Sequence, residues 1–427
     1  MNTTRSLHCF AAAALAGYFA MGPRQVQAQT LTTLHSFTGG ADGAIMFRGA
    51  TRDAAGNLYG MTFYGANLCA DSYSFPGFSN AGCGTIWKLD TSNVLTTLTT
   101  FAGAANGANP DGNLTIHAGR LYGDTWAGGA ANQGMLFSVK PNGGNFVALH
   151  SFNGGDGQHP DSTPRFDAAG NLYSIAAYGG PGFTGADDTG GGVLFQVTAG
   201  GAYVVEHNFS GGADGALPVR IFLDAAGLVF GATTLGGACT GAGLPAAGCG
   251  TLYRFDPATN AFQTIYAFSG GNDGYAPRLA GVDAAGDVWG VTRNGGALGF
   301  GTIFKLKPNG LGGYAYRHLH DFNGASEGAY PTTPAFVAGA FIGGTEQGQQ
   351  TPPAGAGVLY KFKAGVFSTL FTFVNDAKGG YPFGTPVVTS AGDIFGTTGY
   401  GGIAPCNSSA STLISTFGCG TIYRYGP

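Results

Sequence analysis

Four arginines stand at related places in a repeated pattern of this sequence. They begin, or lie shortly after the start of, an apolar run that follows a Gly-rich link: Arg48, Arg220, Arg278 and, slightly further along its run, Arg165. A planar guanidinium fork suits a carboxylate or a sulfate group, so a positively charged ligand site is one interpretation. The alternative is that each arginine pairs with a nearby acid such as Asp42, Asp214 or Asp273.

Aromatic residues recur close to these arginines. One set stands one or two residues before a proline, and it consists of Tyr275, Tyr330 and Tyr381. A second set ends another apolar run of several units, and it consists of Tyr64, Trp126, Tyr178 and Tyr400. Flat rings near arginines suggest a sugar-binding surface, because ring faces bury the apolar C–H surface of a sugar. Packing between neighbouring repeat units is the alternative explanation.

An enzyme would need a group that moves a proton beside the arginines. His159 is the candidate general base, and Tyr275 and Tyr330 are the phenolic candidates. In a lyase, Arg220 or Arg278 would neutralise the carboxylate of a uronate while one of these groups moves the α-proton. The sequence contains no H-E-x-x-H, P-loop or G-x-S-x-G pattern, and it predicts neither a metal site nor a cofactor.

Composition limits the classes of protein to which the chain can belong. Its 427 residues include 79 Gly and 20 Pro, a content that disfavours long helices because glycine destabilises a helix interior. Glycine shows no three-residue period, which excludes collagen. The 44% hydrophobic content can form a large core, and a net charge of −4 without a basic run disfavours nucleic acid as a partner.

The first 28 residues have the pattern of a secretory signal peptide. Arg5 supplies a positive start, the apolar segment 9–21 is too short to span a bilayer, and Val26-Gln27-Ala28 offers a small-x-small cleavage site. We therefore predict a signal peptide over 1–28 and a single domain over 29–427, without a transmembrane segment. The protein is then extracellular or periplasmic.

Six cysteines follow the predicted signal peptide and form three local pairs. Each pair brackets one loop at an equivalent place in a repeat unit, and we predict the disulfides Cys69–Cys83, Cys239–Cys249 and Cys406–Cys419. A metal site is the alternative, but no C-x-x-C occurs and no histidine neighbours the pairs.

Internal repeats predict the fold. A phenylalanine closes a short apolar run seven times, at Phe37, Phe101, Phe152, Phe209, Phe268, Phe322 and Phe373. Each unit contains four runs that are rich in β-branched and aromatic residues and separated by Gly, Asn or Asp, which are strand signals. Seven such units predict a seven-bladed β-propeller with four-stranded antiparallel blades. An open β-solenoid is the alternative, although its rungs usually need fewer residues.

The phase of the repeat predicts how the ring closes. Residues 84–101 contain two runs joined by a short polar link, which we expect to form a hairpin, and the longer link after each phenylalanine should cross to the next blade. Strand 31–37 then has no partner in its own unit, and we expect it to pair with strand 420–425. The crossings and the three disulfide loops should lie on one face, where binding is most plausible.

The repeated string LHSF-GG-DG…DAAGNLYG…GG…GTIFKL resembles the GloVer tandem repeat of secreted bacterial choice-of-anchor proteins. The resemblance covers nearly all of 31–427, and the clearest copies are 31–62, 149–173 and 264–306. It implies an extracellular or surface-attached, propeller-like repeat domain and no defined activity. Segment 340–347 lacks LYG and segment 375–380 lacks GG-DG. The usual anchor segment is not found, which favours secretion over attachment.

Three functions follow as hypotheses. The first is a monomeric binding module for a glycan or another extracellular polymer, with a ligand site formed by Arg48, Arg165, Arg220, Arg278, Tyr275, Tyr330, Tyr381 and Trp126. The second is a polysaccharide lyase or hydrolase that acts on an acidic, uronate-containing glycan. The third is a structural surface protein without a ligand.

Overall fold

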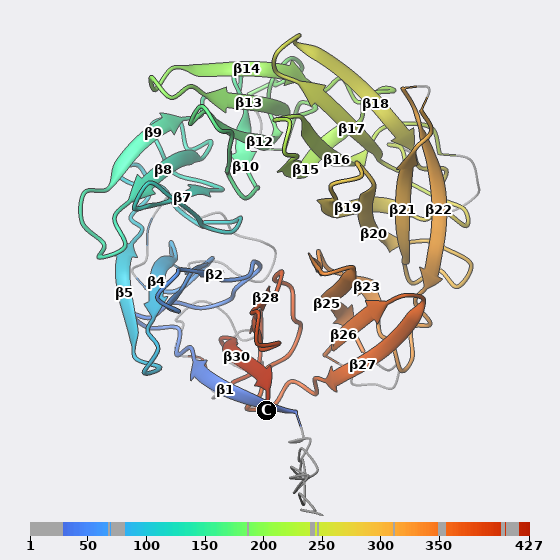
Figure 1. The fold of residues 1–427 in the computed structure, drawn as a ribbon. Coiled ribbons are helices and arrows are strands. Elements are labelled where there is room, and N and C mark those ends of the chain that lie inside the picture. Colours follow the sequence, from blue (N-terminus) through green and yellow to red (C-terminus); the bar gives the residue numbers. More distant parts are fainter. Residues whose placement is uncertain are drawn as a thin grey trace, which may run out of the picture.

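The chain forms a ring of seven β-sheets around a central channel (Figure 1). The computed structural model describes residues 29–66, 69, 82–185, 188–239, 244–245, 247–310, 312–348, 356–402, 406 and 418–427. The signal peptide predicted over 1–28 lies outside these residues. Within them all regular structure is β, and every strand pairs with its neighbours antiparallel. The predicted seven-bladed β-propeller is therefore confirmed.

The first four blades follow the chain from inner to outer strand. Blade 1 contains β2 (Thr51–Arg52), β3 (Leu58–Thr62), β4 (Thr85–Leu89) and β5 (Leu95–Thr100). Blade 2 contains β6 (Thr115–His117), β7 (Arg120–Thr125), β8 (Met135–Val139) and β9 (Val147–Ser151). Blade 3 contains β10 (Gln158–Pro160), β11 (Arg165–Phe166), β12 (Leu172–Tyr178), β13 (Val193–Val197) and β14 (Tyr203–Asn208). Blade 4 contains β15 (Ala216–Leu223), β16 (Val229–Leu235), β17 (Thr251–Asp256) and β18 (Ala261–Ala267).

The remaining blades complete the ring. Blade 5 contains β19 (Tyr275–Val282), β20 (Val288–Asn294), β21 (Thr302–Pro308) and β22 (Tyr314–Asp321). Blade 6 contains β23 (Ala329–Pro331), β24 (Ala335–Val337), β25 (Ala340–Gln347), β26 (Val358–Lys363) and β27 (Val366–Thr372). Blade 7 contains β28 (Val387–Val388), β29 (Ile394–Thr398), β30 (Thr421–Gly426) and β1 (Thr30–Ser36). The inner strands of blades 3 and 6 are split before Pro164 and Pro334, because proline has no N–H for the ladder.

The ring closes as the sequence predicts. β1 pairs antiparallel with β30, with Leu31 opposite Tyr425 and Ser36 opposite Thr421. Phe37 is fully buried, and its N–H donates to the carbonyl of Gly420 at 3.0 Å. The first and last strands thus share one sheet, which leaves no open blade at the junction of the termini (Figure 1).

One backbone hydrogen bond joins each blade to the preceding blade. The donor is the second residue after the Gly or Asp-Gly turn of the crossing, and it has φ between 52° and 60° in every blade. The donors are Ile45, Asn109, His159, Leu217, Ala276, Tyr330 and Tyr381, and their acceptors are the carbonyls of Cys419, Cys83, Gln133, Gly191, Cys249, Phe300 and Ala356. A proline follows the donor in every blade except the first, where Met46 stands there. This sevenfold bond, rather than ligand binding, explains why the crossing sequence recurs.

In blades 1 to 6, the glycine that precedes the third of the four main strands lies against the proline of the next blade. At Gly301, φ is +100°, and an added Cβ would lie 2.4 Å from the Thr292 carbonyl oxygen and 2.6 Å from Pro331 Cδ. Backbone groups cannot move aside as a flexible side chain can. The Gly-Thr start of the GTIFKL motif is therefore required for contact between blades.

Gly301→Ala should accordingly destabilise the protein far more than Gly310→Ala. Gly310 also has positive φ (+74°), but an added Cβ there would meet nothing within 4 Å. The conformational cost of about 1–2 kcal/mol is common to both variants, and only Gly301→Ala adds steric overlap. Urea unfolding of the two variants measures the difference. Equal losses of unfolding free energy would contradict this account of the inter-blade contact.

Histidines and acids of the outer strands pair with each other. The Nε2 atoms of His150, His207 and His320 lie 3.0–3.1 Å from Asp156, Asp214 and Glu327, and His35 Nε2 lies 3.4 Å from Asp42. The Tyr266 hydroxyl donates to Asp273 at 3.0 Å. Asp42, Asp214 and Asp273 thus hold the outer strand to its turn. They are not the partners of the channel arginines; Arg48 and Arg278 form ion pairs with other acids instead.

The three predicted disulfides are present. The Cα–Cα distances are 6.0 Å for Cys69–Cys83 and 5.3 Å for both Cys239–Cys249 and Cys406–Cys419. In each pair the second cysteine supplies the carbonyl of the inter-blade hydrogen bond, so each disulfide lies beside a crossing. Three disulfides fit an extracellular or periplasmic protein. In the described part of the chain, no helix has the length and apolarity needed to cross a bilayer.

Candidate functional site

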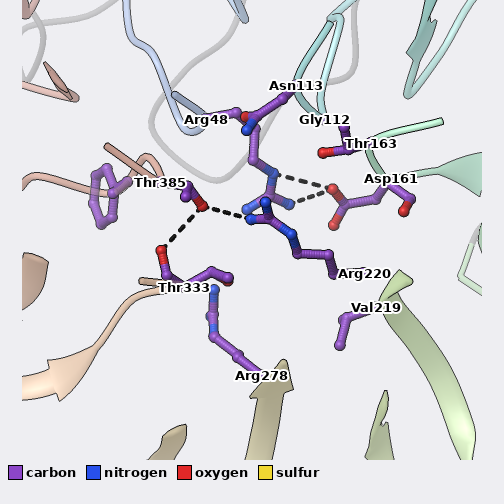
Figure 2. Close-up of a pocket in the computed structure, with 12 residues that line it drawn as sticks. Arg48, Gly112, Asn113, Asp161, Thr163, Val219, Arg220, Arg278, Thr333 and Thr385 are labelled. Carbon is purple, nitrogen blue, oxygen red and sulfur yellow. Dashed lines mark hydrogen bonds and ion pairs between the residues drawn. The ribbon is translucent and has the colours of Figure 1, made fainter. Parts of the chain in front are cut away.

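A small cavity of about 90 Å³ lies in the central channel. Most of its lining comes from the three residues that follow the inter-blade proline, or Met46 in blade 1, so that different blades contribute equivalent positions. The lining residues are Arg48, Gly112, Asn113, Asp161, Ser162, Thr163, Val219, Arg220, Arg278, Thr333, Phe383 and Thr385 (Figure 2). Three of the four arginines singled out in the sequence therefore converge on one cavity.

Arg48 lies against two aspartates, Asp111 and Asp161, from the next two blades. Its Nε lies 2.8 Å from Asp111 Oδ1, and its terminal nitrogen forms an ion pair with Asp161. Burial opposes the charge of Arg48, but Asp111 and Asp161 raise the pKa of the guanidinium above its usual value. Arg48 is thus a cation whose charge is already compensated.

Arg220 reaches across the channel without such compensation. It is the extra residue of a β-bulge in β15, where Val219 pairs with Ala232 and Ile221 with Gly231. A bulge re-aims a side chain, and here Arg220 extends from blade 4 to donate a hydrogen bond to the Thr385 hydroxyl of blade 7 (Figure 2). No described carboxylate forms an ion pair with it, and its Nε is buried without a hydrogen-bond partner.

Burial, together with the neighbouring Arg165, Arg48 and Arg278, lowers the pKa of Arg220 to about 9. At neutral pH the side chain still carries its charge. The guanidinium is therefore a concentrated positive charge in a confined space, where an anion would be attracted most strongly.

Arg278 is intermediate between these two cases. Its terminal nitrogen lies 3.7 Å from Glu346, whose carboxylate is held more closely by Arg293, with Nε 2.8 Å from Oε1. Burial lowers the pKa of Arg278 despite Glu346. One carboxylate is thus shared by two arginines, and Arg278 remains available to a second anion.

Asp111 and Asp124 form an acidic wall behind Arg48. Burial raises the pKa of Asp111 to about 7, although Arg48 opposes the shift. Asp124 on β7 is fully buried, and one of its oxygens accepts from the Ser162 N–H at 3.3 Å. Burial, with Asp161 and Asp111 nearby, raises the pKa of Asp124 well above its usual value. Burial therefore favours the protonated form of both Asp111 and Asp124.

Asp111 should make stability depend on pH. Between about pH 4 and pH 7 the folded chain keeps a proton on Asp111 that the unfolded chain releases, so the unfolding free energy falls as pH rises through this range. The slope for one group is at most about 1.4 kcal/mol per pH unit. Asp111→Asn should make the unfolding free energy less dependent on pH in this range. Urea unfolding of both proteins at a series of pH values measures this dependence. A wild-type profile that Asp111→Asn leaves unchanged would contradict the assignment.

The other predicted site residues lie outside the lining of this cavity. His159 is 1% exposed, stacks on Trp126 with centroids 4.7 Å apart, and has Nδ1 2.6 Å from the Trp126 carbonyl. Tyr330 covers the Arg293 guanidinium at 5.0 Å. Tyr275 packs against the apolar core between blades 4 and 5. Tyr381 also lies outside the lining, but its ring stacks on that of the lining residue Phe383, with the ring centroids 6.0 Å apart.

Sequence reasoning missed the aromatic and acidic parts of this site. Phe383 lines the cavity, and the ring centroid of Phe47 lies 5.8 Å from that of Phe383. Asp161 and Asp111 were not recognised as partners of Arg48. All four residues directly follow the inter-blade proline or Met46. Aligning the units on that position would have brought them together, because innermost strands line the channel.

A family model described as the Gloeobacter/Verrucomicrobia repeat matches residues 19–244 and 239–427. No curated protein matches the chain. Among solved structures, TolB from Acinetobacter baumannii is similar at 13% identity and a TM-score of 0.41, over 74% of this chain and 63% of that chain. A luciferin-regenerating enzyme is similar at 10% identity and a TM-score of 0.43, over 94% and 96% of the two chains. A nidogen/laminin complex is similar at 11% identity and a TM-score of 0.42, over 70% and 92%.

Proposed function

This chain belongs to the Gloeobacter/Verrucomicrobia repeat family, and we propose that it is a secreted binding module whose channel receives the acidic group of an extracellular glycan. The ligand's carboxylate or sulfate contacts Arg220 and Arg278, whereas Arg48 is engaged by Asp111 and Asp161. The predicted signal peptide and the three disulfides support an extracellular location.

The observation that carries this proposal is the environment of Arg220. A structural arginine usually acquires a carboxylate partner when it is withdrawn from water, because an unpaired buried charge is destabilising. Arg220 instead has one threonine hydroxyl and three arginines around it. Such an arrangement lowers stability and favours an anion, as expected at a ligand site.

The size of the cavity supports entry of an acidic group rather than a whole sugar. A water molecule occupies about 30 Å³ in the liquid, so 90 Å³ corresponds to a few waters. A carboxylate or sulfate group of a sugar fits this volume. The ring would remain above the cavity, where half-buried Phe383, Tyr381 and Phe47 offer aromatic surface.

A lyase is supported less well than a binding module. The mechanism requires a proton-transfer group within hydrogen-bond reach of the substrate held by Arg220 or Arg278. His159, Tyr275 and Tyr330 are not among the residues that line the cavity. The carboxylate Asp161 is, but it is engaged by Arg48. We therefore place binding before catalysis.

Binding of polyuronate oligosaccharides tests the proposal. Isothermal titration with oligogalacturonate should give saturable binding that weakens as salt rises, whereas the matching neutral oligosaccharide should not bind. Equal binding of acidic and neutral oligosaccharides, or of neither, would overturn the proposal. An increase in ultraviolet absorbance from unsaturated uronate products would instead support the lyase.

A further inference from the structure

We infer that the channel has a second anion site between Arg165 and Arg220, so that the preferred ligand group is a dianion rather than a single carboxylate. This inference rests on the proposed function and specifies the chemistry of the acidic group. The first charge would lie in the cavity beside Arg220 and Arg278. The second would lie further along the channel, beside Arg165.

The two arginines approach the same aromatic ring. The Arg165 guanidinium carbon lies 4.9 Å from the Phe222 ring centroid, and that of Arg220 lies 5.2 Å from it. Arg165 begins β11 two residues beyond Thr163, which lines the cavity, but Arg165 itself is not among the lining residues. Arg220 lines the cavity and shares the Phe222 ring with Arg165, so it connects the first site with the second.

Neither arginine has the partners that would make it structural. The Nε atoms of Arg165 and Arg220 are both buried without a hydrogen-bond partner. Among the described residues, no carboxylate forms an ion pair with either guanidinium, whereas Arg48, Arg278, Arg293 and Arg424 all have one. Two other partly buried arginines, Arg120 and Arg254, also lack a carboxylate, but Arg120 donates to Ser138 through its Nε and Arg254 donates to the Gln263 side chain.

Electrostatics favours one anion shared by both side chains. Burial lowers the pKa of Arg165 to about 10, and Arg165 is the largest charged contributor to the lowered pKa of Arg220. Two like charges held on one ring repel each other, and an anion between them removes the repulsion while accepting hydrogen bonds from both forks. Cation–π contact with the Phe222 ring orients both guanidinium groups.

A ligand that spans both sites needs two acidic groups a few ångströms apart. Small dicarboxylates such as malonate and succinate provide this chemistry, and a sulfate provides two charges on one centre. Acetate can fill one site only. Affinity should therefore rise from acetate to the dicarboxylate whose length matches the separation of the two sites.

Arg165→Met tests the second site while leaving the first intact. Isothermal titration of wild type should show binding of succinate or malonate at least tenfold tighter than that of acetate. In Arg165→Met this preference should disappear, with acetate affinity unchanged and oligogalacturonate still bound. Arg317 is an exposed residue of β22, outside the channel. Arg317→Met therefore removes one positive charge without touching the site and should keep the wild-type preference for dicarboxylates. Sulfate, titrated in parallel, distinguishes a single-centre dianion from a dicarboxylate.

The outcomes separate this inference from the proposed function. If Arg165→Met keeps the dicarboxylate preference, the second site is wrong even though oligogalacturonate binding stands. An equal loss of acetate and dicarboxylate affinity, accompanied by a lower melting temperature, would make Arg165 a structural residue and also overturn the inference. If wild type prefers dicarboxylates but binds no oligogalacturonate, the second site stands and the glycan proposal fails.

Discussion

Arg220→Met is expected to lower the affinity for oligogalacturonate by at least tenfold while raising the melting temperature. Hydrogen bonds to charged groups contribute about 1.5–3 kcal/mol, which corresponds to roughly 10-fold to 150-fold in affinity. Methionine keeps much of the side-chain length, so the cavity remains lined. Stability should rise because the variant removes a buried charge that lies among Arg165, Arg48 and Arg278 without a carboxylate of its own.

The combination of the two measurements makes this prediction specific. Replacement of a structural arginine lowers both the melting temperature and the ligand affinity. Replacement of an arginine that serves only the ligand lowers the affinity without lowering the melting temperature. Arg317→Met serves as the control for net charge, since this exposed side chain lies on an outer strand. Unchanged oligogalacturonate affinity in Arg220→Met would remove the main support for the proposed site. A lower melting temperature would show that Arg220 stabilises the ring.

A chain that begins at Thr38 is expected to be far less stable than one that begins at Gln29. The shorter chain lacks β1 (Thr30–Ser36) and Phe37, whose side chain is fully buried. Loss of a buried phenylalanine side chain alone typically costs about 3–5 kcal/mol. The deletion also exposes the edge of β30, which then has unpaired backbone groups and can pair with other chains. We expect a fall in melting temperature of more than about 10 °C, or aggregation.

Complementation provides the control for this deletion. A synthetic peptide of residues 29–37 should bind the shortened chain and restore part of the lost stability, because β30 still presents its partner edge. Thermal unfolding monitored by circular dichroism measures both effects. Equal melting temperatures for the two chains would contradict closure by β1, and so would a peptide that changes nothing in a folded shortened chain.

The fold could be predicted from local features of the sequence. Strand length, turn residues and the recurring phenylalanine depend on neighbours within one unit, and the count of seven units then determined the ring and its closure. The disulfide pairing could also be predicted from the sequence, because paired cysteines such as Cys239 and Cys249 bracket a single loop. The recurring prolines also mark the inter-blade contact, and the residues that follow them form the lining of the channel cavity.

The sequence by itself determined the blades, their order and the pairing of the first strand with the last, and it indicated three arginines that line the channel cavity. Only the tertiary structure decided which arginines are neutralised. Arg48 meets Asp161 across 113 residues of sequence, and Arg220 meets Thr385 across 165. The acids nearest in sequence, such as Asp42 and Asp214, are held by the outer strands instead. Repetition specifies each blade separately, but the charges in the channel come from different blades and meet only when the ring has closed.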